Sequence, residues 1–143
     1  MIIKEYSLTY KRKNVDIEKL SSSNVVDSIA RNIFKDFMNI YECFYMFLLD
    51  NQANIKGFVK ISQGGITGCN VDIRLIAKYA IEALATNVIL VHNHPSGTLA
   101  PSREDKTLTQ NVSKALELFD IKVLDHLILT EEGYYSFSDE GLI

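Results

Sequence analysis

The sequence contains few of the residues that cross-link small proteins or break regular structure. Its 143 residues include no tryptophan, two prolines and two cysteines, and Cys43 and Cys69 form no CxxC pair. Two isolated thiols are typical of proteins kept in a reducing compartment. A chain of this length can bury enough apolar surface to fold without disulfide bonds. We therefore expect a disulfide-free protein of the cytoplasm.

Long apolar runs and targeting signals are also absent. No run approaches the roughly 18 residues needed to cross a bilayer, and the N-terminus lacks the charged, apolar and small-residue order of a signal peptide. We therefore expect no membrane association. The chain is 47% hydrophobic and 23% charged, which is ordinary for a packed domain. We predict a single domain over residues 1–143.

Positive charge is scarce in most of the chain. The net charge is -3, with a balance of +2 over residues 1–40 and -5 over residues 41–143. The only basic run is Lys11-Arg12-Lys13, and short triplets of this kind usually lie at a solvated strand or hairpin end. Because DNA binding requires a basic face, the charge gives no support to DNA as a partner.

The hydrophobic pattern predicts an α/β fold. Strands are expected at residues 2–10, 41–50, 55–62, 87–92, 121–130 and 134–137, and helices at 24–38, 72–85 and from Ser102 onward. The stretch 21–24 and Asp72 are expected to cap the first two helices. This order predicts a three-layer fold, in which a mixed β-sheet is flanked by helices. Residues 1–40 then form an N-terminal strand and helix, and residues 41–143 form the core.

Residues 41–50 are aromatic and apolar on both faces, which is typical of a central strand. The next strand alternates and is expected to pair with it. Two helices carry apolar stripes that we expect to face the sheet. The stripes comprise Ile73, Ile76, Ala77, Ala80, Ile81 and Leu84 in one helix and Leu108, Val112, Ala115, Leu116 and Phe119 in the other.

Two of the three histidines lie in the stretch "VILVHNHPSG". His92 and His94 are two residues apart, so in an extended segment their side chains point to the same side, about 6.6 Å apart along the chain. Two imidazoles in this arrangement can converge on one metal ion. A catalytic zinc site requires a third protein ligand and an open fourth position.

The third ligand is predicted to be Asp105. Pro95, Gly97 and Pro101 make the intervening loop turn tightly, and Ser102 and Asp105 then fall three residues apart at a helix start. Ser-x-x-Asp at that position is also a capping-box-like pair. Such a cap would explain the serine and the aspartate, but it would not explain the histidines.

Glu42 begins the most hydrophobic strand of the chain. A buried carboxylate costs several kcal/mol unless it is paired, so Glu42 is either exposed at the strand end or held in a pocket as a general base. Two histidines and a carboxylate also describe the Fe(II) site of oxygenases. We favour Zn²⁺ because neither Glu42 nor Ser102 has an evident role in an oxygenase.

Glu42, His92-x-His94, Ser102 and Asp105 together resemble the motif of the JAB1/MPN+ (JAMM) metalloproteases. The strings "VILVHNHPSGTLAPSREDKTLTQ", "DIKVLDHLILT" and "GYYSFSDEGL" resemble the bacterial RadC family from about residue 40 to residue 143. The first 40 residues resemble the N-terminal extension of short RadC-like proteins. The resemblance implies a JAB/MPN-like (cytidine-deaminase-like) fold and a zinc ion held by His92, His94 and Asp105. It also implies that Glu42 is the general acid and base and that Ser102 stabilises the tetrahedral intermediate.

The sequence departs from its relatives in two respects. Longer RadC proteins carry an N-terminal helix-hairpin-helix region, and we expect no such region before this domain, which weakens any expectation of DNA binding. The long insertion by which eukaryotic deubiquitinating relatives grip ubiquitin is also missing, so the substrate is predicted only as a peptide or protein. The predicted function is zinc-dependent hydrolysis of a peptide or isopeptide bond. The alternatives are a non-catalytic DNA repair or recombination accessory protein with a structural metal, and a domain that binds partners through a sheet edge.

Three further residues have open roles. His126 lies in the middle of a predicted strand. It is either a hydrogen-bonded core residue or a residue that supports the metal site. Cys69 lies in a glycine-rich loop and could line the mouth of the site. Asn93 completes the letters "HNH", but the residues of the HNH nuclease motif are dispersed over a ββα-metal unit, so this adjacency predicts no nuclease.

Overall fold

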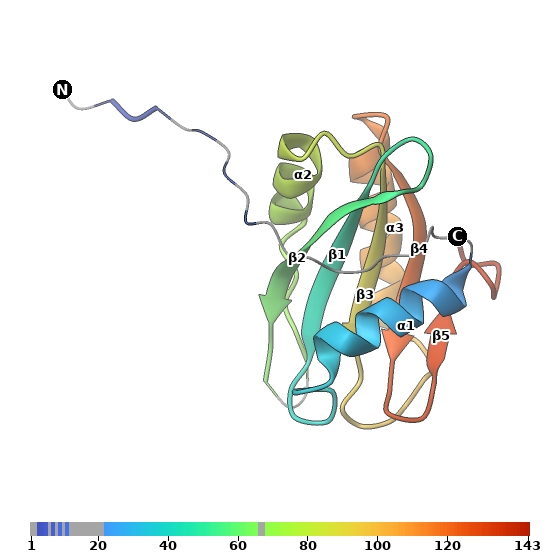
Figure 1. Ribbon diagram of the computed structural model, residues 1–143. Coiled ribbons are helices and arrows are strands. Elements are labelled where there is room, and N and C mark those ends of the chain that lie inside the picture. Colours follow the sequence, from blue (N-terminus) through green and yellow to red (C-terminus); the bar gives the residue numbers. More distant parts are fainter. Residues whose placement is uncertain (1–2, 6, 8, 10, 12–21, 66–67) are drawn as a thin grey trace.

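The computed structural model describes residues 3–5, 7, 9, 11, 22–65 and 68–143. These residues form one mixed sheet in the order β2-β1-β3-β4-β5, flanked by three helices (Figure 1). The strands are β1 (Cys43–Leu49), β2 (Ile55–Gln63), β3 (Asn87–Asn93), β4 (Lys122–Leu129) and β5 (Tyr134–Ser136). The helices are α1 (Ser23–Phe34), α2 (Ile73–Glu82) and α3 (Arg103–Glu117). The predicted three-layer α/β architecture is confirmed.

The sheet pairs its strands largely as their sequences predict. β1 is antiparallel to both β2 and β3, so the strand predicted to be central lies inside the sheet, and all seven of its residues are buried. β3 is parallel to β4, and the short β5 closes the other edge as an antiparallel partner of β4. In the described part of the chain, no helix combines the length and apolar character needed to span a bilayer.

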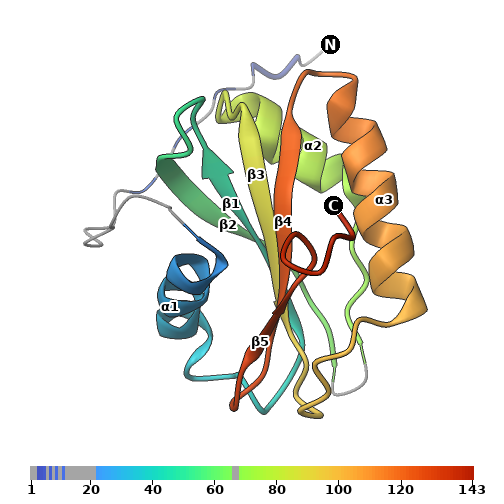
Figure 2. The same cartoon turned by 90° about the vertical axis from the view of Figure 1, so that its right-hand side faces the viewer.

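The two faces of the sheet carry separate cores. α1 lies against one face, and α2 and α3 lie against the other (Figure 2). Side chains of β1 alternate between these layers: Phe44 and Met46 pack on the side of α2 and α3, whereas Tyr45 and Phe47 pack on the side of α1. His92 on β3 is the register partner of Phe44, which positions it on the face that α2 and α3 cover.

The helix starts differ from the prediction at one point. Asp72 caps α2, as predicted, because its side chain accepts a hydrogen bond of 2.9 Å from the backbone N–H of Arg74. The N-cap residue of α1 is Ser22, which lies in the stretch predicted to cap this helix, but its side chain does not make the expected capping hydrogen bond. The neighbouring Ser23 hydroxyl instead contacts Tyr134 and Asp139. Burial of the apolar face of α1 therefore stabilises this helix without a serine cap.

Three residues of the predicted apolar stripes are exposed instead. Ile81 is 41% exposed, Leu84 is 78% exposed and Phe119 is 52% exposed. α2 ends at Glu82, and Leu84 adopts a left-handed conformation with φ 51°, which turns its side chain away from the helical stripe. Phe119 likewise lies beyond the last helical residue of α3. For Leu84 and Phe119, the 3.6-residue periodicity was therefore extended past the helix ends, whereas Ile81 lies within α2 and is exposed there.

Part of the N-terminal prediction lies outside the described residues. Of the strand predicted at residues 2–10, only residues 3–5, 7 and 9 are described, and these belong to no strand. Arg12 and Lys13 of the basic triplet are outside the described residues as well. The described basic residue of this triplet, Lys11, is exposed.

A buried carboxylate fastens the C-terminal segment to β4. Asp125 accepts hydrogen bonds from the Ser136 hydroxyl at 2.6 Å, the Ser138 backbone at 2.9 Å and the His126 backbone at 2.7 Å. Asp125 is only 6% exposed. Burial raises the pKa of this carboxyl, and the three hydrogen bonds only partly oppose the effect.

The raised pKa of Asp125 predicts a pH dependence of stability. Because the folded-state pKa lies above the unfolded-state value of about 3.9, the stabilising contribution of this group is fully present below the unfolded pKa. It is lost as the pH rises through the folded pKa. Asp125→Asn does not titrate, so its unfolding free energy should rise relative to wild type from about pH 4 to pH 7, by about 1.4 kcal/mol for each unit of pKa difference.

Urea unfolding of both proteins at a series of pH values, with a chelator present, measures this difference. A free-energy difference between wild type and variant that stays constant over the whole range would contradict the prediction.

Candidate metal centre

His92 and His94 lie at the C-terminal end of β3. β3 ends at Asn93, so His92 lies inside the strand, one residue further from its end than predicted. Its side chain is buried, and its register partners on the two neighbouring strands are Phe44 and Ile128. His94 follows the strand directly, and its backbone N–H donates to the carbonyl of Leu129 at 2.9 Å. Both histidines are therefore held by the rigid sheet.

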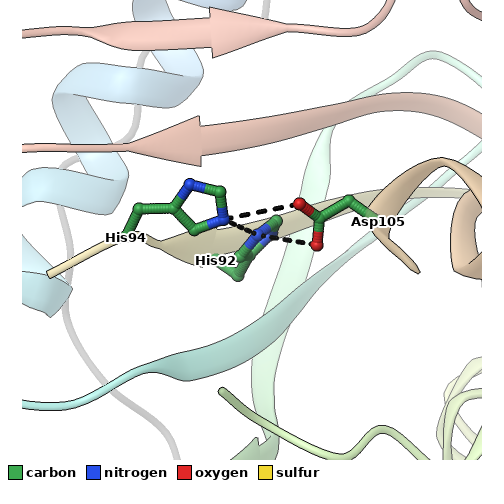
Figure 3. A group of neighbouring side chains, drawn as sticks. All are labelled: His92, His94 and Asp105. Atoms are coloured by element: carbon green, nitrogen blue, oxygen red, sulfur yellow. Dashed lines mark hydrogen bonds and ion pairs between the residues drawn. The ribbon is translucent and has the colours of Figure 1, made fainter. Parts of the chain in front are cut away.

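The first turn of α3 brings Asp105 to the histidines. Ser102 and Asp105 form the capping box that their spacing predicts: the Ser102 hydroxyl accepts from the Asp105 backbone at 3.0 Å, and the Ser102 backbone donates to Asp105 Oδ2 at 2.7 Å. The same carboxylate faces both imidazoles (Figure 3). Capping and contact with the histidines are therefore two simultaneous roles of Asp105.

The Nε2 atoms of His92 and His94 and the carboxylate group of Asp105 form a small triangle. The Nε2 atoms of His92 and His94 are 2.9 Å apart, His92 Nε2 lies 3.3 Å from Asp105 Oδ1, and His94 Nε2 lies 3.4 Å from Asp105 Oδ2. These residues are the only group of three or more potential metal ligands that converges within the described part of the chain.

The triangle has the dimensions of one face of a zinc site. Tetrahedral zinc with ligand distances of about 2.0–2.1 Å has ligand-to-ligand edges of roughly 3.3 Å. The two Nε2 atoms are 2.9 Å apart, and they lie 3.3 and 3.4 Å from different oxygens of the Asp105 carboxylate. Two imidazoles and one carboxylate are also the donor types that zinc prefers. The residues present therefore fit a zinc ion with three protein ligands.

The electrostatics of the group favour a bound cation. Burial opposes ionisation of Asp105, but hydrogen bonds with His92 and His94 outweigh it and hold the pKa of this carboxyl well below its usual range. Burial likewise opposes protonation of His94, but Asp105 and the Thr98 carbonyl outweigh it and raise the pKa of His94. A metal ion and protons would therefore compete for the same atoms.

Glu42 lies beside this group without belonging to the triangle. It immediately precedes β1 and is half-buried. Burial is the main cause that raises the pKa of its carboxyl, and the charges of His92 and His94 oppose the rise. Its carboxylate is therefore close enough to the cluster to interact with it electrostatically, and it is easier to protonate than an ordinary glutamate.

The backbone of Glu42 is held by a glycine pair that the sequence analysis did not single out. Gly64 N–H donates to the Glu42 carbonyl at 2.8 Å, and Glu42 N–H donates to the Gly65 carbonyl at 3.2 Å. A Cβ atom at Gly64 would lie 1.7 Å from the Gly68 carbonyl oxygen, so this position excludes any side chain. The "GG" pair after the predicted strand at residues 55–62 was the available signal.

Comparison with known proteins identifies the family. The sequence model of a protein family described as the RadC-like JAB domain matches residues 20–142 of the chain. The chain belongs to the RadC-like JAB domain family. The resemblance predicted from the motif is thereby confirmed, and the mixed five-stranded sheet flanked by helices agrees with a JAB/MPN-like fold.

Several curated UPF0758 proteins are similar to this RadC-like domain. It is 43% identical over 126 residues to a UPF0758 protein of Flavobacterium johnsoniae, covering 88% of this chain and 54% of that protein. It is 44% identical over 100 residues to a UPF0758 protein of Porphyromonas gingivalis, covering 69% and 44%. A UPF0758 protein of Trichlorobacter lovleyi is 36% identical over 132 residues, covering 92% and 56%. The RadC-like chain thus spans about half the length of these relatives.

Two further residues of the RadC-like domain reach the candidate metal centre from outside the predicted motif. His126 on β4 contacts His92 through a ring-to-ring hydrogen bond of 2.8 Å, and Thr109 on α3 contacts His126 at 2.6 Å. The sequence left His126 open between a core role and a supporting role, and the structure gives it both a buried position and a contact with His92. Thr109 was not singled out, although it lies one helical turn after Asp105.

Cys69 has a more ordinary environment. Its thiol is half-buried and lies 2.6 Å from the Ser62 hydroxyl. Burial raises the pKa of this thiol, although the hydrogen bond with Ser62 opposes the rise. A raised pKa disfavours the reactive thiolate, so these contacts give Cys69 no nucleophilic role.

Proposed function

We propose that this RadC-like domain is a zinc-dependent hydrolase that cleaves an amide bond of the peptide or isopeptide type. The observation that carries the proposal is the triangle of His92 Nε2, His94 Nε2 and the Asp105 carboxylate, whose edges are 2.9–3.4 Å long. Three protein ligands leave a fourth position of a tetrahedral ion open, which is the pattern of a catalytic rather than a structural zinc site.

Partial exposure of the triangle supports a catalytic role. The His92 side chain is 1% exposed, whereas those of His94 and Asp105 are 14% and 13% exposed. Solvent therefore reaches one side of the group, and the opposite side is packed against the sheet. When bound, zinc would supply Lewis acidity and lower the pKa of a water at its open position to about 7.

Glu42 supplies the proton transfer in this proposal. Its carboxyl lies beside the histidines, and burial raises its pKa from the ordinary value. A carboxyl whose pKa is shifted toward neutrality both accepts a proton from the attacking water and returns it to the leaving amine more readily. Glu42 therefore acts first as general base and then as general acid.

Ser102 supplies a hydrogen-bond donor. Its oxygen accepts from the Asp105 backbone, which leaves the hydroxyl hydrogen available to donate. The residue is exposed and lies at the N-terminus of α3, where the helix dipole favours negative charge. We propose that this hydroxyl stabilises the negative oxygen of the tetrahedral intermediate.

Glu42→Gln tests the proposal, because it should separate metal binding from turnover. The purified wild-type chain, loaded with zinc, is assayed against a panel of fluorogenic peptides and isopeptide-linked dipeptides. Wild type should cleave at least one member, and Glu42→Gln should retain one equivalent of zinc while its turnover falls by about 10²–10⁴-fold. A parallel preparation loaded with Fe(II) compares the two metals.

Lys11→Gln serves as the control in the same assay, because it changes the charge of an exposed residue outside the site. The proposal fails if Glu42→Gln cleaves the substrate as fast as wild type. It also fails if zinc-loaded wild type cleaves nothing in the panel while the Fe(II) form carries out an oxidation.

A further inference from the structure

A hydrogen-bonded chain runs from the metal centre through the core to α3. His92 Nδ1 lies 2.8 Å from His126 Nε2, and His126 Nδ1 lies 2.6 Å from the Thr109 hydroxyl. The Thr109 hydroxyl lies 2.7 Å from the backbone carbonyl of Asp105. The chain therefore begins at one predicted metal ligand, His92, and ends on the backbone of another, Asp105.

The direction of every hydrogen bond in this chain follows from its last member. A carbonyl oxygen only accepts, so the single hydroxyl hydrogen of Thr109 is donated to Asp105. Thr109 then has only lone pairs to offer His126, and His126 Nδ1 must carry a proton. A neutral His126 therefore has a bare Nε2, which accepts from His92 Nδ1–H and leaves the Nε2 lone pair of His92 facing the triangle.

The surroundings of His126 are apolar and exclude solvent, and such surroundings disfavour a charged ring. The residue is 0% exposed, and Thr109 is 2% exposed. Phe44 and Phe137 contact the His126 ring at centroid distances of 5.4 and 4.8 Å.

The same tautomer is imposed on His94 by a different partner. His94 Nδ1 lies 2.6 Å from the Thr98 carbonyl, which can only accept, so His94 also keeps its proton on Nδ1. With both imidazoles neutral, two Nε2 lone pairs face each other at 2.9 Å beside a carboxylate. A cation between them relieves this repulsion.

We propose that Thr109 and His126 are positioning residues that lock His92 in the tautomer able to bind metal. The inference rests on the metal site of the proposed function. It adds His126, which is hydrogen-bonded to the ligand His92, and Thr109, which is hydrogen-bonded to His126. Without the Thr109 hydroxyl, His126 can move its proton to Nε2 and donate to His92 Nδ1. His92 would then carry its own proton on Nε2, where it blocks the metal.

Two matched pairs of variants test the lock by zinc affinity, measured by competition with a chromogenic chelator. Thr109→Val removes the hydroxyl at nearly constant volume, and Thr109→Ser keeps it. His126→Phe removes the acceptor for His92 Nδ1, and His126→Gln offers an amide oxygen near the position of Nε2. Thr109→Val and His126→Phe should bind zinc about 10–100-fold more weakly than wild type. Thr109→Ser should remain within about threefold of wild type, and His126→Gln should recover part of the loss.

A spectroscopic measurement on wild type tests the lock without any variant. Long-range ¹H–¹⁵N correlation spectra of the zinc-loaded protein report which ring nitrogen of each histidine carries a proton. We expect protonated Nδ1 in all three histidines, with the bare Nε2 of His126 hydrogen-bonded to His92. A purely structural role for His126 would not require the proton to be on Nδ1 rather than on Nε2.

The outcomes separate this inference from the proposed function. If wild type binds no zinc, the proposed function fails, and this inference fails with it. If wild type binds zinc but Thr109→Val and Thr109→Ser bind it equally well, only the lock is overturned. A His126 protonated at Nε2 in zinc-loaded wild type overturns the lock as well, even if a variant fails to fold.

Discussion

Asp105→Ala is expected to abolish stoichiometric zinc binding. The substitution removes the carboxylate whose two oxygens lie 3.3 and 3.4 Å from the Nε2 atoms of His92 and His94, and it leaves only two imidazoles as ligands. Loss of a supporting residue around a metal site typically costs about 10–100-fold in affinity, and loss of a direct ligand should exceed that range. Elemental analysis after dialysis against trace zinc measures the stoichiometry.

Asp105 also caps α3, so its variants need a control for folding. Asp105→Asn keeps an oxygen that can accept from the Ser102 backbone, and it should lose zinc although the helix start is preserved. Ser102→Ala removes the other half of the capping box at a cost of about 1 kcal/mol but keeps all three donors, and it should retain zinc. Retention of zinc by both Asp105 variants would exclude Asp105 as a ligand.

Phe44→Ala is expected to produce the largest loss of stability among residues near the site. Phe44 is 2% exposed and packs on the sheet face covered by α2 and α3. Removal of a buried phenylalanine side chain costs about 3–5 kcal/mol. The Phe44 ring also contacts the rings of His92 and His126, at centroid distances of 5.7 and 5.4 Å. The zinc affinity of the folded variant should therefore fall together with its stability.

Phe47→Ala is the matched control for this prediction. Phe47 lies on the same strand and is 1% exposed, but it packs on the opposite face, in the core beneath α1. Both variants should lose similar unfolding free energy in urea, and only Phe44→Ala should bind zinc more weakly. Equal affinities in the two variants would mean that Phe44 contributes to stability alone. The corresponding leucine substitutions provide milder versions if either alanine variant does not fold.

The elements with strong periodicity were predictable from the sequence. β1 reads as an uninterrupted apolar run, so its central, fully buried position follows directly. The prediction failed where an apolar pattern continued past a change of backbone direction. Leu84 and Phe119 are apolar and correctly spaced, but each follows the last residue of its helix and is exposed.

The candidate site was predictable to the extent that its residues are close in sequence or carry a recognisable spacing. His92, His94 and Asp105 converge in the structure, and the capping box at Ser102 forms as its spacing predicts. The hydrogen-bonded contact of Thr109 and His126 with His92 was not predictable, because it depends on the strand register that pairs Leu90 with His126. Only the tertiary arrangement shows that Thr109, one turn after Asp105, reaches this histidine.

Diffraction at the zinc absorption edge, from crystals of the wild-type chain grown with zinc, tests the central claim most directly. We expect one anomalous peak about 2.0–2.2 Å from His92 Nε2, from His94 Nε2 and from an oxygen of Asp105. A peak with other ligands, or no peak beside these residues at saturating zinc, would contradict the proposed metal centre.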